Sequence, residues 1–277
     1  PVFSDKFPDS VFILDFAGTI ALVSGARLAV RLYHEEVRPT AEGVAPRLLV
    51  VGAGNAGENV VREILRMYSQ GWFPMAEARD APAQWVQPNR RALIPLDESF
   101  RVSRSLRARV RSGKFVIRCD SAFEQVIRAC AQPGPGRADT WINDDIIAWY
   151  TLLHRAGHAH SIEAYLPNNR GGANADPNGE LMLVGGLYGV TLGAAFCGES
   201  MFSRPSLGGT DASKVCLVHL VHHLRRAGVT LLDAQIQNAH TDQFGAVQVA
   251  RTKYLKLLGE ARPKGIAWPE FDPSLAV

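Results

Sequence analysis

From Phe100 onward, strand patterns and helix patterns alternate along the sequence. Hydrophobic periodicity predicts helices at 103–111, 122–131, 144–156 and 211–227, and strands at 115–119, 159–165, 181–190, 194–201 and 230–237. Proline, glycine and asparagine gather at 131–139 and 166–180, which predicts two surface loops. Mixed strands and helices of this kind form a layered α/β or α+β domain.

The stretch LLVVGAGNAGENVVREIL, Leu48 to Leu65, reads as a strand, a glycine turn and an amphipathic helix. Gly52, Gly54 and Gly57 have the spacing of a dinucleotide-binding turn, in which a helix N-terminus faces a pyrophosphate. Such a site also needs a second strand that ends in an acidic residue about 20 positions later. The following residues contain no such strand, so we expect scaffold here and no dinucleotide site.

Composition indicates an ordinary globular protein, with 21% charged and 47% hydrophobic residues. A net charge of +3 permits a polyanionic partner without requiring one. Asp15 and Arg27 interrupt the apolar N-terminal stretch, which argues against a signal peptide or a membrane span. The four cysteines form no C-x-x-C pair, so we expect free thiols, a reducing compartment and a cytoplasmic location.

Polar side chains interrupt two of the expected strands. In TLLDAQIQ, strand alternation places Asp233, Gln235 and Gln237 on one face. In AAFCGESMF, the same alternation aligns Cys197, Glu199 and Met201. Each acid alone could equally be a structural carboxylate in an ion pair. Two such strands in one short domain favour a functional site.

Nine ordered blocks resemble the leucyl/phenylalanyl-tRNA-protein transferases of bacteria: GWFPMAE, VSRSLR, DSAFEQVIRACA, TWI, LHRAGHAHSIEAY, VGGLYGV, CGESMFSR, DASKVCLVHLV and LLDAQ. The resemblance covers residues from about 64 to the C-terminal region. It implies an α+β fold in which a catalytic domain with an N-acetyltransferase-like mixed sheet, 100–277, follows a small N-terminal domain, 64–99. We expect residues 1–63 to be an atypical α/β segment with a partial Rossmann-like unit.

The resemblance also implies the reaction. Such enzymes move Leu or Phe, and less readily Met, from aminoacyl-tRNA to the α-amine of proteins that begin with Arg or Lys, which marks those proteins for degradation by the N-degron route. Because the donor is an activated ester, no cofactor, metal or covalent intermediate is needed. An α-amine with a reference pKa of about 7.7 to 8.0 is partly neutral at neutral pH, unlike a lysine side chain.

Residue roles carried over from the family are expectations. Asp233 and Gln235 match the proposed catalytic pair, with Asp233 either a general base or an electrostatic anchor. Glu199 matches the acid near the reacting ends of both substrates, where its charge suits a basic N-terminal residue. The apolar pocket for the aminoacyl side chain would use five matching positions, which alone would read as core: Met201, Leu187, Leu217, Leu220 and Leu224.

A transfer RNA partner needs phosphate contacts and a platform for the terminal base. The basic run SRSLRARVRSGKFVIR supplies the cations Arg104, Arg107, Arg109, Arg111, Lys114 and Arg118. Trp141 matches the family aromatic near the terminal adenosine, and Trp85 is a second candidate. Met75 stands where the family often has a tryptophan, so that stacking contact is expected to be lost or shared.

Histidines gather in HRAGHAH and in HLVHH. His154, His158 and His160 come without nearby acids or thiols in a ligand pattern, and so do His219, His222 and His223. We therefore expect no metal, and we expect the second cluster to be exposed, opposite the leucine stripe.

Three other functions are alternatives to aminoacyl transfer. A nucleotide-sugar epimerase or dehydratase resembles residues 8–65, but only over the first Rossmann unit. An acetyl-CoA-dependent N-acetyltransferase would share the fold, but it needs a pyrophosphate-binding Q/R-x-x-G-x-G/A motif that this chain lacks. A noncatalytic tRNA or degron-binding module would leave Asp233 and Gln235 idle. No membrane partner is expected.

Overall fold

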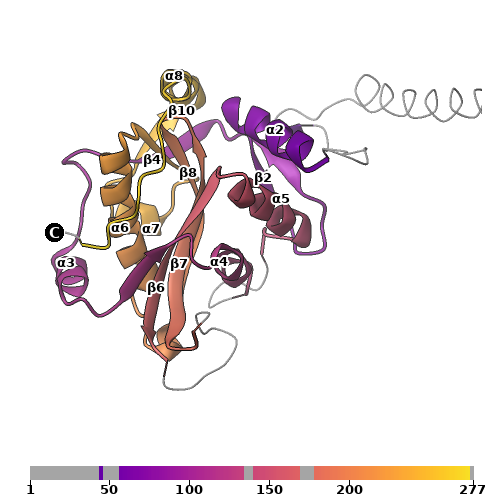
Figure 1. Cartoon of the computed structure of the whole chain (residues 1–277). Helices are drawn as coiled ribbons and strands as arrows, with labels where there is room; N and C mark the ends of the chain where they lie inside the picture. The colour runs from indigo at the N-terminus through magenta and orange to yellow at the C-terminus, as the bar shows by residue number, and fades with distance from the viewer. Residues whose placement is uncertain (1–43, 46–55, 134–139, 169–177, 275–277) are drawn as a thin grey trace, which may run out of the picture. The chain divides into compact units, whose positions relative to one another are not determined.

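A computed structural model describes residues 44–45, 56–133, 140–168 and 178–274 of the chain (Figure 1). The chain divides between Pro46 and Arg47 into two units. The described part of the first unit is strand β1 (Val44–Ala45), and all elements discussed below belong to the second. The strand expected before the glycine turn, together with Gly52 and Gly54, lies outside the described residues, as does most of each expected surface loop.

A seven-stranded mixed sheet forms the centre of the second unit, with the strand order β10-β4-β9-β8-β7-β6-β5. Its strands are β4 (Arg90–Ile94), β5 (Val116–Cys119), β6 (Ala159–Pro167), β7 (Leu181–Leu192), β8 (Ala195–Ser203), β9 (Leu231–Gln235) and β10 (Val247–Ala250). All neighbours pair antiparallel except β8 and β9, which are parallel. A second, antiparallel pair joins β2 (Phe73–Met75) to β3 (Gln84–Val86).

Helices cover both faces of the large sheet (Figure 1). One face carries α6 (Ala212–Ala227), which α3 (Arg104–Arg111) contacts. The other carries α4 (Phe123–Cys130), α5 (Asp144–Arg155) and α2 (Ala56–Ser69), while α8 (Arg251–Ala261) packs on β4, β9 and β10. Two short elements, η2 (Pro205–Leu207) and α7 (Ala239–Asp242), complete the described fold.

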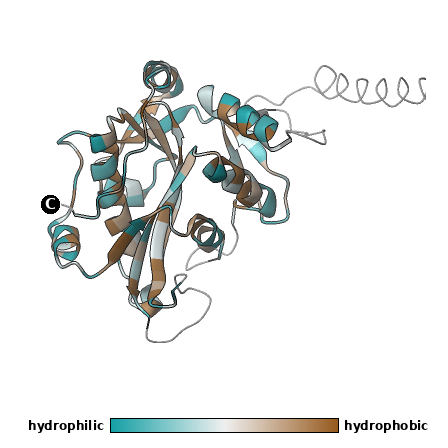
Figure 2. Cartoon of the chain, viewed as in Figure 1, coloured by the Kyte–Doolittle hydropathy of each residue, from teal (hydrophilic) through white to brown (hydrophobic). Residues whose placement is uncertain are grey.

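The main core lies between α6 and the sheet. It contains Leu187, Phe196, Leu220 and Leu224, each at most 4% exposed. A smaller cluster under α8 includes Leu93, Leu231 and Tyr254. Figure 2 shows that apolar residues concentrate in the sheet and on the helix sides facing it. Burying these surfaces is the main stabilising contribution to such a fold.

Every helix and strand expected after Phe100 is present, with ends displaced by a few residues at most. The expected thiols are also present: none of the four cysteines is in a disulfide, and Cys130, Cys197 and Cys216 are buried. The sequence patterns did not predict β4, β10 or α8. Strand β4 begins with two arginines, and β10 is an edge strand of four residues, which is too short for its alternation to predict a strand.

Candidate active site

Strands β8 and β9 pair over three residues only, and the last pair of this parallel ladder is Cys197 with Asp233. Beyond it β8 runs on to Ser203 beside β7, and β9 ends at Gln235. One side-chain contact spans the two strands where their ladder has ended. Gln235 Nε2 donates a hydrogen bond to Glu199 Oε2 over 2.8 Å.

The Glu199 carboxylate also accepts hydrogen bonds from two buried tyrosines. Tyr68 on α2 donates to Oε1 at 2.6 Å, and Tyr150 on α5 donates to Oε2 at 2.8 Å. The two hydroxyl oxygens lie 2.5 Å apart. The Glu199 residue is half-buried, but its carboxylate lies among these donors. Four groups from α2, α5, β8 and β9 therefore form one polar cluster.

Burial raises the pKa of Glu199 to about 7, although hydrogen bonds from Tyr68, Gln235 and Tyr150 act in the opposite direction. Burial raises the pKa of Tyr68 and of Tyr150 well above the usual value, and the negative charge of Glu199 adds a smaller increase. Both hydroxyls therefore keep their protons at neutral pH. The cluster thus holds one carboxyl group that exchanges a proton near neutrality, surrounded by neutral donors.

A β-bulge sets the direction of Glu199. Tyr188 on β7 pairs with Ser200 and Gly189 pairs with Gly198, which leaves Glu199 as the extra residue. Met201, two positions later, packs against the core beneath α6. The expectation that Cys197, Glu199 and Met201 share one face by simple alternation is therefore wrong, because the extra residue interrupts the period.

Gln235 has a left-handed backbone, with φ of +60°. A non-glycine residue is strained in this region by about 1–2 kcal/mol. Its backbone N–H donates to Asp233 Oδ1 at 2.8 Å, which is the local bond by which an aspartate closes a turn. The strand ends there, so the expectation that Gln237 continues the same face is wrong. Gln237 instead donates to Asp242 at the surface.

Asp233 has no exposed surface, and its carboxylate is surrounded by donors. Arg91 on β4 donates to it from Nε, at 3.0 Å to Oδ1, and from Nη2, at 2.6 Å to Oδ2. The Tyr254 hydroxyl on α8 donates to Oδ2 at 2.9 Å. Arg91 is itself 1% exposed. Removing one partner of such a buried pair leaves the other charge buried without compensation, which destabilises the fold by about 3–5 kcal/mol.

The two carboxylates of the site thus have different surroundings. Asp233 is saturated by Arg91, Tyr254 and the backbone of Gln235, and it contacts no open space through which a substrate proton could reach it. Glu199 is half-buried and accepts hydrogen bonds from Tyr68, Tyr150 and Gln235, none of which is a cation. Of the two roles expected for Asp233, this geometry is that of an anchor.

The residues expected to bind the aminoacyl side chain lie together beneath α6. Leu187, Leu217, Leu220 and Leu224 are at most 6% exposed and belong to one core cluster, against which Met201 packs. The leucines are therefore core residues, and a pocket among them stays a prediction. Ile236 follows Gln235 at the end of β9 and is 49% exposed.

The two tryptophans expected near the terminal adenosine have different surroundings. Trp141 is half-buried, and its carbonyl accepts the N–H of Ala76 at 3.0 Å, which places it beside Met75. Trp85 is 1% exposed, stacks on Trp149 and meets Tyr68 edge-on. We therefore correct the expectation for Trp85, because a side chain packed in this way is a core residue and offers no face to a base.

The basic run extends over α3 and the following turn. Arg104, Arg107 and Arg111 are exposed, and Arg109 is half-buried. Lys114 is held in the fold, since its ammonium donates to the carbonyl of Gly208 at 2.7 Å. Arg118 lies over the ring of Tyr165. The arginines of α3 are thus the part of the run that is presented to solvent.

The second histidine cluster is not exposed, contrary to expectation. His219 and His223 are 6% and 1% exposed, because Phe271 and Trp268 of the C-terminal segment lie against them. Burial lowers the pKa of both imidazoles to about 4. Among the described residues, no three His, Cys, Asp or Glu side chains are grouped to hold a metal ion.

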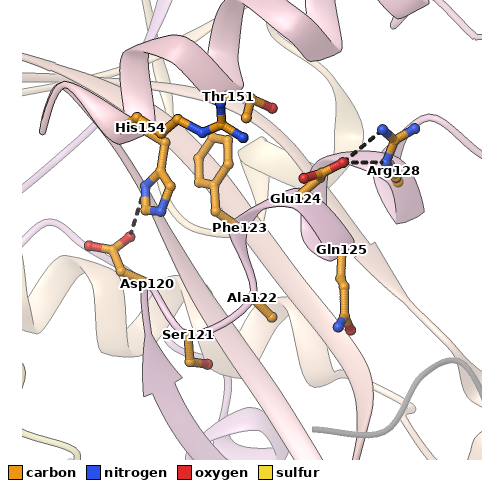
Figure 3. A pocket seen from close by; sticks show the side chains of 10 residues that line it. Asp120, Ser121, Ala122, Phe123, Glu124, Gln125, Arg128, Thr151 and His154 are labelled. Atoms are coloured by element: carbon orange, nitrogen blue, oxygen red, sulfur yellow. Dashed lines mark hydrogen bonds and ion pairs between the residues drawn. The ribbon is translucent and has the colours of Figure 1, made fainter. Parts of the chain in front are cut away.

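A cavity of about 460 Å³ lies between the start of α4 and the end of α5 (Figure 3). Asp120, Phe123 and His154 line it, and His154 stacks on the ring of Phe123. Its charges are mixed, since Glu124 and Arg128 pair across its rim. This cavity does not include Glu199, Gln235 or Asp233.

Four residues of the site were absent from the sequence-based set: Tyr68, Tyr150, Arg91 and Tyr254. Arg91 carried a usable signal, since it is a charged residue directly before the apolar run ALIPL. Tyr68 and Tyr150 lie on helices with no local sign of a shared partner. Their meeting at Glu199 depends on tertiary packing of α2 against α5.

Comparison with known proteins identifies the class of enzyme. Residues 93–259 match the family model described as "Leucyl/phenylalanyl-tRNA protein transferase". The transferase of that name from Chlorobaculum parvum is 46% identical over 206 residues, which are 74% of this chain and 97% of the relative. Those from Maricaulis maris and Paramagnetospirillum magneticum are 48% and 47% identical, over 72% and 77% of this chain and 84% and 93% of the relatives.

These matches define an aminoacyltransferase. The chain belongs to the leucyl/phenylalanyl-tRNA-protein transferase family and has that activity. Among solved structures, that of FemX aligns with a TM-score of 0.44 and 11% identity, over 76% of this chain and 72% of the other, which is too weak to support an argument. No helix in the described part of the chain has the length and apolar character needed to cross a membrane.

Proposed function

We propose that the enzyme transfers Leu or Phe, and less readily Met, from aminoacyl-tRNA to the α-amine of a protein that begins with Arg or Lys, as a step of N-degron protein degradation. The observation that carries this proposal is the Gln235–Glu199 contact at the point where β8 and β9 stop pairing. A carboxylate and a carboxamide there suit an incoming amine. The amine needs a hydrogen-bond acceptor that orients it and a base that takes its proton.

In the proposed reaction the acceptor nitrogen attacks the ester carbonyl carbon, and the bond from that carbon to the ribose oxygen breaks. Glu199 takes one proton from the α-ammonium and passes it to the ribose oxygen as that oxygen leaves. The nitrogen, which is still protonated after the attack, loses a second proton to solvent as the amide forms. The pKa of Glu199, raised by burial to about 7, is close to the reference pKa of an α-amine, so this proton transfer is nearly balanced. Gln235 orients the amine, and Asp233 anchors Gln235.

The apolar residues beneath α6 support the proposed preference for apolar aminoacyl side chains that are not β-branched. Met201 follows Glu199 by two residues on β8 and packs against the cluster of Leu187, Leu217, Leu220 and Leu224. We propose that the aminoacyl side chain enters between the ends of β8 and β9 and is received by these residues. Methionine side chains adapt to differently shaped ligands, which suits a pocket that accepts both Leu and Phe.

Charge supports the proposed choice of acceptor. Glu199 is the carboxylate of the cluster that is not already paired with an arginine, so it is the group that attracts a cationic protein N-terminus. A second positive charge on an N-terminal Arg or Lys side chain strengthens this attraction over that for a neutral first residue.

The tRNA is proposed to lie along α3, whose arginines would contact phosphates without reading sequence. Trp141, whose backbone carbonyl bonds to the residue after Met75, would receive the terminal adenosine together with Met75. Parallel pairing of β8 with β9 inside an otherwise antiparallel sheet supports an N-acetyltransferase-like fold. Since charged tRNA is a cytoplasmic molecule, the proposed reaction is cytoplasmic.

The test is direct transfer. The full chain is incubated with Leu-tRNA and a peptide beginning with Arg, and mass spectrometry is used to look for one added leucine at the N-terminus. A matched peptide beginning with Ala and a reaction with uncharged tRNA are the controls. Absence of product with the Arg peptide contradicts the proposal, and equal product with the Ala peptide contradicts the acceptor preference. Acetylation by acetyl-CoA would instead favour the N-acetyltransferase alternative.

A further inference from the structure

Arg91 is a buried residue whose contacts hold neighbouring parts of the fold in place. Its guanidinium is sandwiched between the rings of Phe73 and Tyr254, at 4.6 Å and 4.4 Å from their centroids. It is 1% exposed, so it is closed off from a substrate. Within the described part of the chain its guanidinium donates hydrogen bonds to Asp233, to Tyr254 and, from Nη1, to the carbonyl of Gly71 at 2.9 Å.

The partners of Arg91 adjoin two different residues of the Glu199 cluster, Gln235 and Tyr68. Through Asp233, Arg91 fixes the carboxylate that accepts the backbone N–H of Gln235. Through Gly71, it fixes the turn that follows α2, three residues after Tyr68. Gln235 and Tyr68 are two of the three donors to Glu199. The guanidinium of Arg91 is thus bonded both to Asp233, which holds Gln235, and to the turn that follows Tyr68.

The turn at Gly71 is closely packed. Gly71 has φ of +83°, and a Cβ there would lie 2.7 Å from the side chain of Leu255 and 3.2 Å from that of Tyr254. Helix α8 therefore presses on the turn from one side while Arg91 holds its carbonyl from the other. This part of the fold has little freedom to adjust if one contact is lost.

Gln235 is the residue most in need of such support, because its left-handed backbone is unfavourable for glutamine. The N–H bond to Asp233 holds that conformation, and it is effective only if the carboxylate cannot rotate. Two anchors prevent rotation: the two-pronged contact with Arg91 and the hydroxyl of Tyr254 at 2.9 Å.

We propose that Arg91 and Tyr254 are positioning residues of the transfer reaction: by clamping Asp233 they hold Gln235 in its left-handed conformation, with its carboxamide against Glu199. This inference rests on the proposed function for the role of Gln235. Neither residue touches a substrate, so their removal is expected to lower kcat while leaving the KM for aminoacyl-tRNA nearly unchanged.

The main variant is Tyr254→Phe, which removes one hydroxyl and keeps the ring over Arg91. The matched control is Tyr165→Phe, since Tyr165 is a buried tyrosine on β6 whose hydroxyl lies near Ser121, away from the site. With saturating Leu-tRNA and an Arg peptide, we expect Tyr254→Phe to lower kcat about tenfold, as for a lost hydrogen bond to a charged group, and the control to retain kcat within about twofold.

A double-mutant cycle separates positioning from general loss of structure. If Tyr254 acts through Gln235, then Tyr254→Phe changes kcat by less than about twofold in a Gln235→Ala background, measured by single-turnover transfer. An equal, tenfold fall in both backgrounds overturns the proposal. Arg91→Lys keeps the charge but loses the two-pronged contact, and we expect a larger fall in kcat than for Tyr254→Phe. Should Arg91→Lys not fold, Tyr254→Phe and the cycle decide.

Different results would contradict the proposed function and the positioning role of Tyr254. A wild-type enzyme that transfers no leucine contradicts the proposed function, and the inference with it. A wild-type enzyme that transfers leucine, with Tyr254→Phe equally active, contradicts the inference alone.

Discussion

Gln235 and Glu199 touch across two parallel strands whose ladder has already ended, Nε2 to Oε2 at 2.8 Å. Each residue departs from regular strand geometry to reach the other. Glu199 is the extra residue of a β-bulge, and Gln235 has a left-handed backbone. Irregularities of this kind gather at functional sites, where the surrounding structure compensates their cost.

Replacing Glu199 by Gln is expected to lower kcat/KM by about 10² or more, because the proposed proton acceptor is lost while size and hydrogen bonding are largely kept. In the wild type the ionised form increases as pH rises through about 7, so activity should rise over that range. Rate profiles between about pH 5 and pH 9, corrected for spontaneous ester hydrolysis, measure this. The acceptor α-amine also deprotonates, at a reference pKa of about 7.7 to 8.0, so Glu199→Gln should keep only that higher rise. A separate rise near 7 that persists in Glu199→Gln contradicts the assignment.

Removing Arg104 and Arg107 from α3 is expected to raise the KM for aminoacyl-tRNA and to leave kcat unchanged. Each lost phosphate contact should reduce the slope of log affinity against log salt by about 0.7 to 1. Arg128→Ala, on α4, is the control because Arg128 is equally exposed but pairs with Glu124. A salt dependence equal to that of the wild type would show that the tRNA does not lie along α3.

Met75→Trp is expected to strengthen donor binding, since it restores an aromatic surface beside Trp141. Stacking on a base contributes about 1–3 kcal/mol, which corresponds to a KM lower by about tenfold. A minimal donor, an aminoacyl ester of adenosine, should show the same gain as full-length tRNA. A gain confined to the full tRNA would place the new contact away from the terminal adenosine.

Glu163 gives a prediction on stability. It has no exposed surface, and burial raises its pKa to about 7, although hydrogen bonds from Ser161 and Ser121 oppose the rise. A carboxyl group whose folded-state pKa is raised stabilises the fold most at low pH, and that stability is lost as pH rises from about 4.5 to 7. Relative to Glu163→Gln, the wild type should lose about 3 kcal/mol over this range.

Urea unfolding at several pH values measures this difference. Glu124→Gln is the control, because Glu124 is an exposed glutamate on α4. A constant difference between wild type and Glu163→Gln across the range would mean that Glu163 does not change its protonation state on folding.

Sequence patterns predicted most of the elements after Phe100 and made Asp233, Gln235 and Glu199 candidates for the site, because strand alternation and helix periodicity are local properties. They could not predict the bulge at Glu199 or the left-handed Gln235, since both depend on neighbouring strands. They also misread Trp85, because exposure of a tryptophan in a short strand is decided by packing against Trp149 and Tyr68.

The error about His219 and His223 has the same origin. Helical periodicity placed them opposite the leucine stripe, on a side that would face solvent in an isolated layer. The C-terminal segment returns over that side and covers both imidazoles with Trp268 and Phe271. A segment without a helix or strand pattern of its own leaves no periodic signal of where it packs.

The bond from Arg91 to Tyr254 joins residues 163 positions apart in the chain. A nascent polypeptide therefore has Glu199, Gln235 and both tyrosines of the cluster before it has the residue that completes the clamp on Asp233. Until helix α8 has left the ribosome and docked, the strained end of β9 lacks one of its two anchors. Catalytic competence in this enzyme should thus be acquired only once helix α8 has docked, even though most of the sheet is able to form earlier.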